Sequence, residues 1–311
     1  MQKFKKIILL LLSVFLLVLS SCATATNESL ADQPNIAGKL VFTCFDFPEI
    51  DAVRDKSGDC TLITFPDGQT MLVDAGISST SKYICNYLKE LGIEKLDYVV
   101  LTHPHSDHWG GFVSFDEGPG ILDSFDVEKA IVAKFPPSRS QKFFDDLHEH
   151  NVEIIEVERG DVFNVGDVMF EVLNPGEGEN LISTVITADT NNASLVFRIT
   201  YKNNTALMTG DIYSRQELNL VKLFSADKKL DVQFLKIPHH GYDTSDTMKF
   251  VQAVSPEIAV AEGGIDMASF IYDRYVSVGS EVYITILDGT VTVAGDGEDF
   301  EVISTTKERD K

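Results

Sequence analysis

The sequence predicts an α/β fold in which two sheets pack together and helices cover them. From Lys39 onward, short β-rich runs alternate with helical stretches, a pattern typical of layered α/β domains. The segments at 95–105 and 229–239 both begin Lys-Leu-Asp and end Pro-His, at a separation of 134 residues. Each segment runs from a strand to a histidine, so we expect two similar halves in a pseudo-duplicated, two-sheet sandwich.

The first half contains short apolar strands with helices between them. We expect strands at 40–47, 60–65 and 70–74, the last two joined by the turn Pro66-Asp67-Gly68. These strands are followed by a helix at 81–91, a strand at 96–101, a helix at 139–150, a strand at 152–157, and strands around Val162 and at 168–173.

The second half repeats this order. We expect strands at 194–200 and 205–209, a helix at 216–224, a strand at 230–237, and then alternating helices and strands that end with strands at 281–286, 290–294 and 300–303. No shift in composition divides the chain, so 39–305 is expected to be one domain, followed by a charged tail at 306–311.

Composition excludes several classes of protein. The 311 residues are 44% hydrophobic and 24% charged, which is too apolar for a disordered chain and too polar for a multi-span membrane protein. With 26 basic and 48 acidic residues, the formal net charge is -22. A surface this acidic repels polyanions, so we expect no stable nucleic-acid binding.

The N-terminus has the pattern of a lipoprotein signal peptide at 1–21. Three lysines at positions 3, 5 and 6 precede an apolar run at 7–19, which is short for a permanent membrane span. Leu19-Ser20-Ser21-Cys22 resembles a bacterial lipobox, so we expect Cys22 to be lipidated and the protein to be exported to the cell envelope and membrane-anchored there. Residues 22–38 would then form a flexible tether. A plain secretory signal or an uncleaved anchor is the alternative.

The remaining cysteines lack the spacing of a zinc finger. A disulfide between Cys44 and Cys60 is conceivable outside the cytoplasm. Because no cysteine pair has zinc-finger spacing, any metal site must use histidine and carboxylate ligands.

The strongest chemical signal is the segment 102–111, Thr-His-Pro-His-Ser-Asp-His-Trp-Gly-Gly, directly after an apolar strand. Three histidines and an aspartate in six residues suit two adjacent metal ions. We expect His103 and His105 to bind one metal, and Asp107 and His108 to bind the other. The alternative is a polar loop or an adventitious metal patch.

Two further strand ends carry similar residues. Gly210-Asp211 offers a carboxylate able to bridge two cations, although Gly-Asp also forms ordinary turns. In Pro238-His239-His240-Gly241, we expect one histidine to be a metal ligand and its neighbour to form a hydrogen bond. The 134-residue repeat aligns His239 with His105 and so favours His239 as the ligand. Five of the seven histidines lie in these loops.

These motifs, in this order, resemble the metallo-β-lactamase superfamily and, within it, the hydrolase domain of ComEC-type competence proteins. The resemblance covers about 39–305 and includes Ser57-Gly58-Asp59-Cys60, the segments 65–76, 192–196 and 282–290, and the loops above. It implies an αββα sandwich of two mixed sheets flanked by helices. It also implies two divalent metal ions, with Zn²⁺ expected and Mn²⁺ or Fe²⁺ as alternatives. Asp74 would orient a ligand histidine.

The sequence departs from the family pattern at two places. Many members have another histidine before the Gly-Asp strand, but none lies between His150 and His239. We consider Asp189 and Asn192 as candidates for the vacant ligand position. The second departure is at 262–266, Glu-Gly-Gly-Ile-Asp, where competence-type domains often carry Asn and His-Pro.

The resemblance predicts a metal-dependent phosphodiesterase that uses a metal-bridging hydroxide on a small or exposed anionic substrate. Asp211 would bridge the metals, Asp107 would help orient the nucleophile, and Tyr242 and Ser245 would donate hydrogen bonds to an oxyanion. A lactonase or β-lactamase-like amide hydrolase is one alternative. A non-catalytic, metal-stabilised binding lipoprotein is the other.

Overall fold

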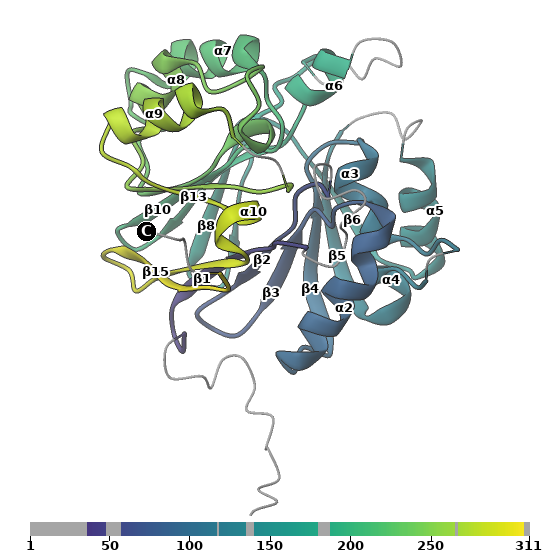
Figure 1. Cartoon of the computed structure of the whole chain (residues 1–311). Coiled ribbons are helices and arrows are strands. Elements are labelled where there is room, and N and C mark those ends of the chain that lie inside the picture. Colours follow the sequence, from purple (N-terminus) through teal and green to yellow (C-terminus); the bar gives the residue numbers. More distant parts are fainter. Residues whose placement is uncertain are drawn as a thin grey trace, which may run out of the picture.

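The computed structural model describes residues 36–47, 57–116, 118–134, 140–179, 187–264 and 267–307. Two mixed sheets pack face to face, and helices lie on the outer side of each (Figure 1). This arrangement confirms the predicted αββα sandwich. The expected signal peptide, Cys22 and most of the tether lie outside the described residues. No helix in the described part of the chain is long and apolar enough to cross a membrane.

The first sheet has eight strands in the order β15-β14-β1-β2-β3-β4-β5-β6. Its strands are β1 (Leu40–Cys44), β2 (Thr61–Thr64), β3 (Thr70–Val73), β4 (Lys95–Leu101), β5 (Asp126–Ala133), β6 (Glu153–Val157), β14 (Val291–Gly295) and β15 (Phe300–Thr305). Strands β1, β2 and β3 pair antiparallel, whereas β3 to β6 pair parallel.

The second sheet has seven strands in the order β13-β12-β11-β10-β9-β8-β7. Its strands are β7 (Val162–Val165), β8 (Val168–Asn174), β9 (Val196–Tyr201), β10 (Asn204–Met208), β11 (Phe234–Lys236), β12 (Ile258–Ala261) and β13 (Glu281–Ile284). Strands β8, β9 and β10 pair antiparallel and β10 to β13 pair parallel. Both halves therefore share one pairing order, as the internal repeat predicts.

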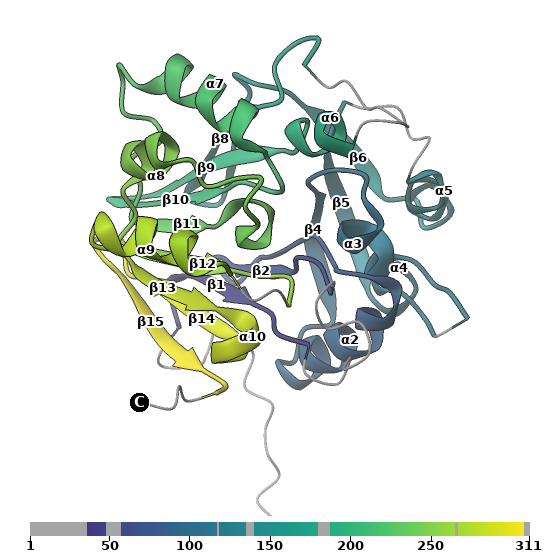
Figure 2. The ribbon, with the colours of Figure 1, turned by 45° about the horizontal axis from the view of Figure 1, so that its top comes forward.

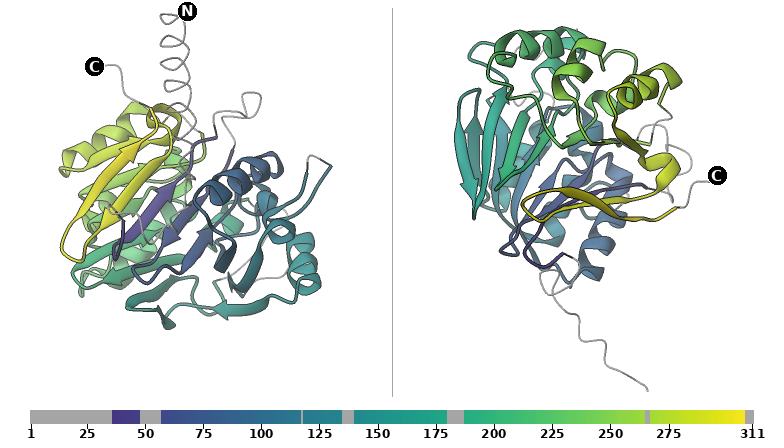
Figure 3. Two further views of the ribbon diagram at one scale, coloured as in Figure 1. Left: turned by 90° about the horizontal axis from the view of Figure 1, so that it is seen from below. Right: turned by 90° about the vertical axis from the view of Figure 1, so that its left-hand side faces the viewer.

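The helices form two outer layers. They are α2 (Ser81–Glu90), α3 (Ser106–Trp109), α4 (Ile121–Ser124), α5 (Gln141–Glu149), α6 (Thr187–Asn192), α7 (Ser214–Phe224), α8 (Met248–Val254), α9 (Ser269–Ser277) and α10 (Thr285–Asp288). Apolar side chains of α2, α4 and α5 pack on the first sheet, and those of α7, α8 and α9 pack on the second. Figures 2 and 3 show the same two layers from other sides.

Aromatic side chains fill the space between the sheets. Phe42 of β1 meets Phe234 of β11 with ring centroids 4.8 Å apart, and Phe65 meets Phe170 of β8 at 6.0 Å. All four rings are buried. Large buried rings contribute much of the apolar area that holds two sheets together.

Three local expectations differ from the structure. Strand β5 was not predicted, because three of its first four residues are charged and only Ala130–Ala133 is fully buried. Strand β11 is shorter than the expected 230–237, since a turn with a hydrogen bond from Asp231 N to Lys228 O precedes it. Cys44 lies opposite Thr61 rather than Cys60, and both thiols are free and buried.

Candidate metal centre

The expected site residues come together at the carboxyl ends of strands from both sheets. Parallel strands place the loops that follow them at the same edge of a sheet, where ligands commonly bind. The loop after β4 carries His103, His105, Asp107 and His108, the loop after β10 carries Asp211, and the loop after β11 carries His239 and His240. Because the two halves share one topology, these three loops meet at a single place.

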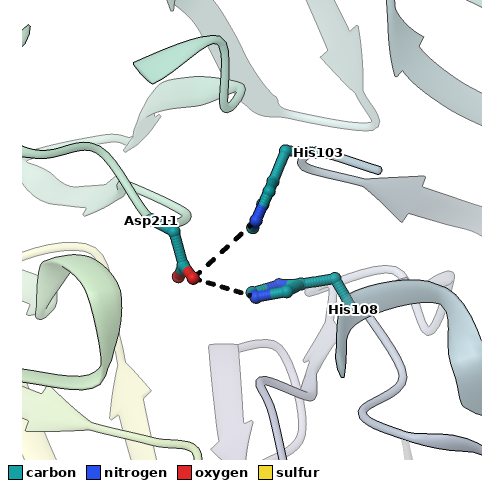
Figure 4. Close-up of side chains that lie close together, drawn as sticks. All are labelled: His103, His108 and Asp211. Atoms are coloured by element: carbon teal, nitrogen blue, oxygen red, sulfur yellow. Dashed lines mark hydrogen bonds and ion pairs between the residues drawn. The ribbon is translucent and has the colours of Figure 1, made fainter. Parts of the chain in front are cut away.

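Asp211 lies at the middle of the cluster and is buried. Its Oδ2 atom lies 3.1 Å from His108 Nε2 and 3.7 Å from His103 Nε2 (Figure 4). The same oxygen lies 3.4 Å from His240 Nε2 and 3.9 Å from His239 Nε2. Four imidazoles therefore face one carboxylate oxygen.

His105 and Asp107 extend the cluster on two sides. His105 Nδ1 lies 3.0 Å from His103 Nε2. Asp107 Oδ2 lies 3.9 Å from His240 Nε2, and about a third of the Asp107 side chain is exposed. Asp107 thus connects the buried cluster to solvent.

The adjacent histidines at 239 and 240 both face Asp211, whereas only one was expected to do so. Their φ angles are 44° and 59°, in the left-handed region that side chains other than glycine rarely adopt. Two left-handed residues in succession turn both imidazoles to the same side of the chain. His239 Nε2 thus lies 3.9 Å from Asp211 Oδ2, together with His240.

Two of the histidines, His108 and His240, each contact a buried carboxylate through Nδ1. Asp74 Oδ2 lies 2.7 Å from His108 Nδ1, and the backbone N–H and hydroxyl of Thr102 donate to the same carboxylate. Asp59 Oδ1 lies 2.8 Å from His240 Nδ1, and its other oxygen pairs with the buried Lys236 ammonium. Such contacts fix the ring and leave Nε2 free for a metal.

The role of Asp59 was missed at the sequence level. Its motif, Ser57-Gly58-Asp59-Cys60, was part of the family resemblance but had no assigned function. Asp59 and His240 are 181 positions apart, so no local spacing could reveal their contact.

Electrostatics in the cluster favour a bound cation. Burial opposes charge on His240, but Asp211 and Asp59 outweigh it and raise the pKa of His240 to about 10. Burial also opposes charge on Asp211, yet His240 and His108 hold its pKa well below the usual range. Burial lowers the pKa of His239 to about 4, although Asp211 acts in the opposite direction. His240 therefore holds a proton that a divalent cation can displace, whereas His239 is already neutral and can accept a cation directly.

The donor set fits a pair of metal ions. Among the described residues, four overlapping groups bring ligand atoms within 4.8 Å of one another: His103, His108 and Asp211; Asp107, His108 and His240; Asp211, His239 and His240; and Asp59, Asp74 and His108. Asp211 Oδ1 is buried and has no hydrogen-bond partner in the described part of the chain. Imidazole nitrogen and carboxylate oxygen are ligands that zinc prefers.

The candidates for the vacant ligand position have other partners in the structure. Asp189 of α6 pairs with Arg215 at 2.9 Å, and Asn192 Oδ1 accepts a hydrogen bond from Tyr213 N at 3.0 Å. Asp189 joins none of the metal-ligand groups found among the described residues. Their side chains organise the loop beside the cluster instead.

The two expected substrate contacts have different surroundings. The Tyr242 side chain is 37% exposed and its ring lies 5.0 Å from that of His239, so its contact with substrate stays a prediction. Ser245 is buried and donates to the Ile212 carbonyl at 2.8 Å. That hydrogen bond holds the loop in place, and the expected contact of Ser245 with an oxyanion stays a prediction.

Comparison with known families agrees with this geometry. The model of the metallo-beta-lactamase superfamily matches residues 53–261. The chain belongs to this superfamily. Its buried His/Asp cluster has the ligands for divalent metal ions that this superfamily is built to hold.

Relatives within the superfamily include competence proteins. The chain is 27% identical over 250 residues to ComE operon protein 3 of Bacillus subtilis, which covers 72% of this chain and 30% of that protein. It is 29% identical over 233 residues to competence protein ComA of Neisseria gonorrhoeae, which covers 74% of this chain and 29% of that protein. The chain thus spans less than a third of the length of these relatives, and the expected competence-protein relationship is confirmed.

Solved structures show the same fold. The metallo-beta-lactamase fold protein YhfI of Bacillus subtilis is 15% identical, with a TM-score of 0.53 over 82% of this chain and 100% of that chain. A mutant of CmlA beta-hydroxylase is 13% identical, with a TM-score of 0.50 over 82% of this chain and 53% of that chain.

Proposed function

We propose that this metallo-β-lactamase superfamily hydrolase is a phosphodiesterase, exported and lipid-anchored through Cys22, that acts on small or exposed anionic substrates. The observation that carries the proposal is the Asp211 carboxylate, which four histidine Nε2 atoms face within 4 Å. When bound there, two divalent ions would lower the pKa of water and stabilise negative charge on the attacked group.

The chain's own residues supply the positioning. Asp211 would contact both ions, and the partly exposed Asp107 lies where substrate and water can enter. Tyr213 and Tyr242 flank His239, with ring centroids 4.7 and 5.0 Å from it. These rings and their hydroxyls are suited to orient a bound ester beside the cluster.

Two considerations favour a phosphodiester of limited size. Another relative, 26% identical over 70% of this chain, is recombination protein 2 of Haemophilus influenzae, and recombination acts on a phosphodiester backbone. The net charge of -22 opposes binding of a long polyanion at the surface. A local pair of cations would still attract a small anion.

Activity can be tested on the purified full chain, prepared without chelator. We expect two bound divalent ions per chain and hydrolysis of bis-(p-nitrophenyl) phosphate, both reduced in His105→Ala and Asp211→Ala. A chromogenic lactam serves as the comparison substrate. Lactam cleavage without phosphodiester cleavage would select the amide hydrolase, and bound metal without turnover would select the binding lipoprotein.

The anchor is tested separately. Cells that express the wild-type chain or Cys22→Ser are labelled with radioactive palmitate. Label and membrane association should be present in the wild type and absent from the variant. Equal labelling of both would refute lipidation at Cys22.

A further inference from the structure

The histidines of the cluster fall into two sets that differ in the chemical group that contacts their Nδ1 atoms. We call Asp107, His108 and His240 the carboxylate-backed group, and His103 and His239 the hydroxyl-backed group. His105 lies beside the second group, with its Nδ1 3.0 Å from His103 Nε2. Asp211 contacts both groups. The difference between them has consequences for metal affinity.

In the carboxylate-backed group, both histidines contact a buried carboxylate through Nδ1. Asp74 lies 2.7 Å from His108, and Asp59 lies 2.8 Å from His240. A carboxylate partner holds the N–H of the ring, fixes the tautomer and makes Nε2 a stronger donor to a metal.

In the hydroxyl-backed group, the corresponding partners are neutral. The Thr102 hydroxyl lies 3.1 Å from His103 Nδ1, and the Thr244 hydroxyl lies 2.6 Å from His239 Nδ1. A hydroxyl can orient the ring, but it adds no negative charge. These imidazoles should therefore be weaker donors than His108 and His240.

The distribution of charge acts in the same direction. Four carboxylates (those of Asp59, Asp74, Asp107 and Asp211) contact His108 or His240. Lys236 offsets part of this charge through its pairing with Asp59 and its 3.9 Å approach to Asp211 Oδ1. For His103 and His239, the carboxylate in contact is Asp211. A divalent cation thus meets more negative charge in the carboxylate-backed group.

We propose that the two metal ions bind in a fixed order, with the carboxylate-backed group and Asp211 filled first and the hydroxyl-backed group filled second and more weakly. Asp59 is then a positioning residue that acts on the first ion through His240. The proposal rests on the two-metal centre of the proposed function.

The test is a titration of the full chain, stripped with chelator, with Zn²⁺ alone against a competing chromophoric chelator. We expect two steps whose dissociation constants differ at least tenfold. Asp59→Asn should weaken the first step by about 10–100-fold. Thr244→Val is the matched variant, because it removes the partner of the neighbouring histidine, and it should weaken the second step.

Two results would overturn the proposal: two steps of equal affinity, or an effect of Asp59→Asn confined to the weaker step. If Asp59→Asn fails to fold, as judged from circular dichroism, Asp107→Asn and His105→Ala replace the pair. Asp107 belongs to the carboxylate-backed group, His105 contacts the hydroxyl-backed group, and neither residue is fully buried. Asp107→Asn should then abolish the tighter step and His105→Ala the weaker one. The titration does not depend on turnover, so an inactive chain with two ordered steps would refute the phosphodiesterase and retain this inference.

Discussion

Replacing Gly58 by alanine should displace the metal-binding loop. Gly58 has φ +77°, and a Cβ atom built on it would lie 1.7 Å from the Asp107 carbonyl oxygen. Real Cβ contacts shorter than 3.0 Å essentially do not occur, so one of the two backbones must move by about 1.3 Å (3.0 minus 1.7). The loop of Asp107 and that of Asp59 would separate.

Both stability and turnover should respond. A left-handed residue with a side chain costs about 1–2 kcal/mol, and misplacement of catalytic groups by about 1 Å can reduce the rate about 100-fold. We therefore expect Gly58→Ala to lower the free energy of unfolding by more than 2 kcal/mol. We also expect it to reduce phosphodiester turnover per folded chain about 100-fold.

Gly92→Ala is the matched control. Gly92 has nearly the same φ, +73°, but no atom lies within 4 Å of its added Cβ. It should therefore show the backbone cost alone, about 1–2 kcal/mol in a urea melt, with turnover per folded chain unchanged. If the two variants have equal turnover and equal metal content, the contact between Gly58 and Asp107 does not position the metal loop.

Three further predictions concern stability. Phe42→Ala, which removes a buried ring 4.8 Å from Phe234, should lower the free energy of unfolding in urea by about 3–5 kcal/mol, and a change below 1 kcal/mol would contradict the packing of the two sheets. Burial raises the pKa of Glu217 to about 7 from an ordinary 4.5, against backbone donors at Thr247 and Asp246. Between pH 4.5 and 7, the Glu217 carboxyl keeps its proton in the native state and loses it in the unfolded state. The free energy of unfolding should therefore fall by about 3 kcal/mol as pH rises through this range. In urea melts at a series of pH values, the free energy of unfolding should fall less steeply with pH for Glu217→Gln than for the wild type. Equal pH dependence of the two proteins would exclude the raised pKa of Glu217. Zn²⁺ at about one hundred times its dissociation constant should stabilise the chelator-treated chain by about 2.7 kcal/mol, and calorimetry that shows no rise in Tm would argue against a metal site that forms on folding.

Local patterns in the sequence were sufficient to predict most of the strands and the position of the site. An apolar strand followed directly by histidine or aspartate is visible within ten residues, as in the loops of His103 and Asp211. The expected structural role of Asp74, which rests on the family resemblance, agrees with its 2.7 Å contact to His108. These features are local in sequence, or they belong to the strand ends that the repeat aligns.

Other parts of the site depend on contacts that no spacing reveals. Asp59 reaches His240 across 181 positions, and the pairing of the two halves decides that contact. The shared orientation of His239 and His240 depends on two successive left-handed residues, a conformation that histidine does not predict. Burial of Ser245, which directs its hydroxyl to Ile212, likewise follows from packing of the loop.

The duplicated backbone explains why the chemistry is asymmetric. The 134-residue repeat places Lys236 at the position equivalent to Thr102, and both residues contact a carboxylate near a strand end. Thr102 donates to Asp74, and Asp74 contacts His108 Nδ1, the ring nitrogen on the side away from Asp211. Lys236 instead lies between Asp59 and Asp211, and its charge offsets two carboxylates that contact His240. Since two equivalent positions hold a neutral hydroxyl and a buried ammonium, the halves share one fold but impose different electrostatics on His108 and His240, the two histidines of the carboxylate-backed group.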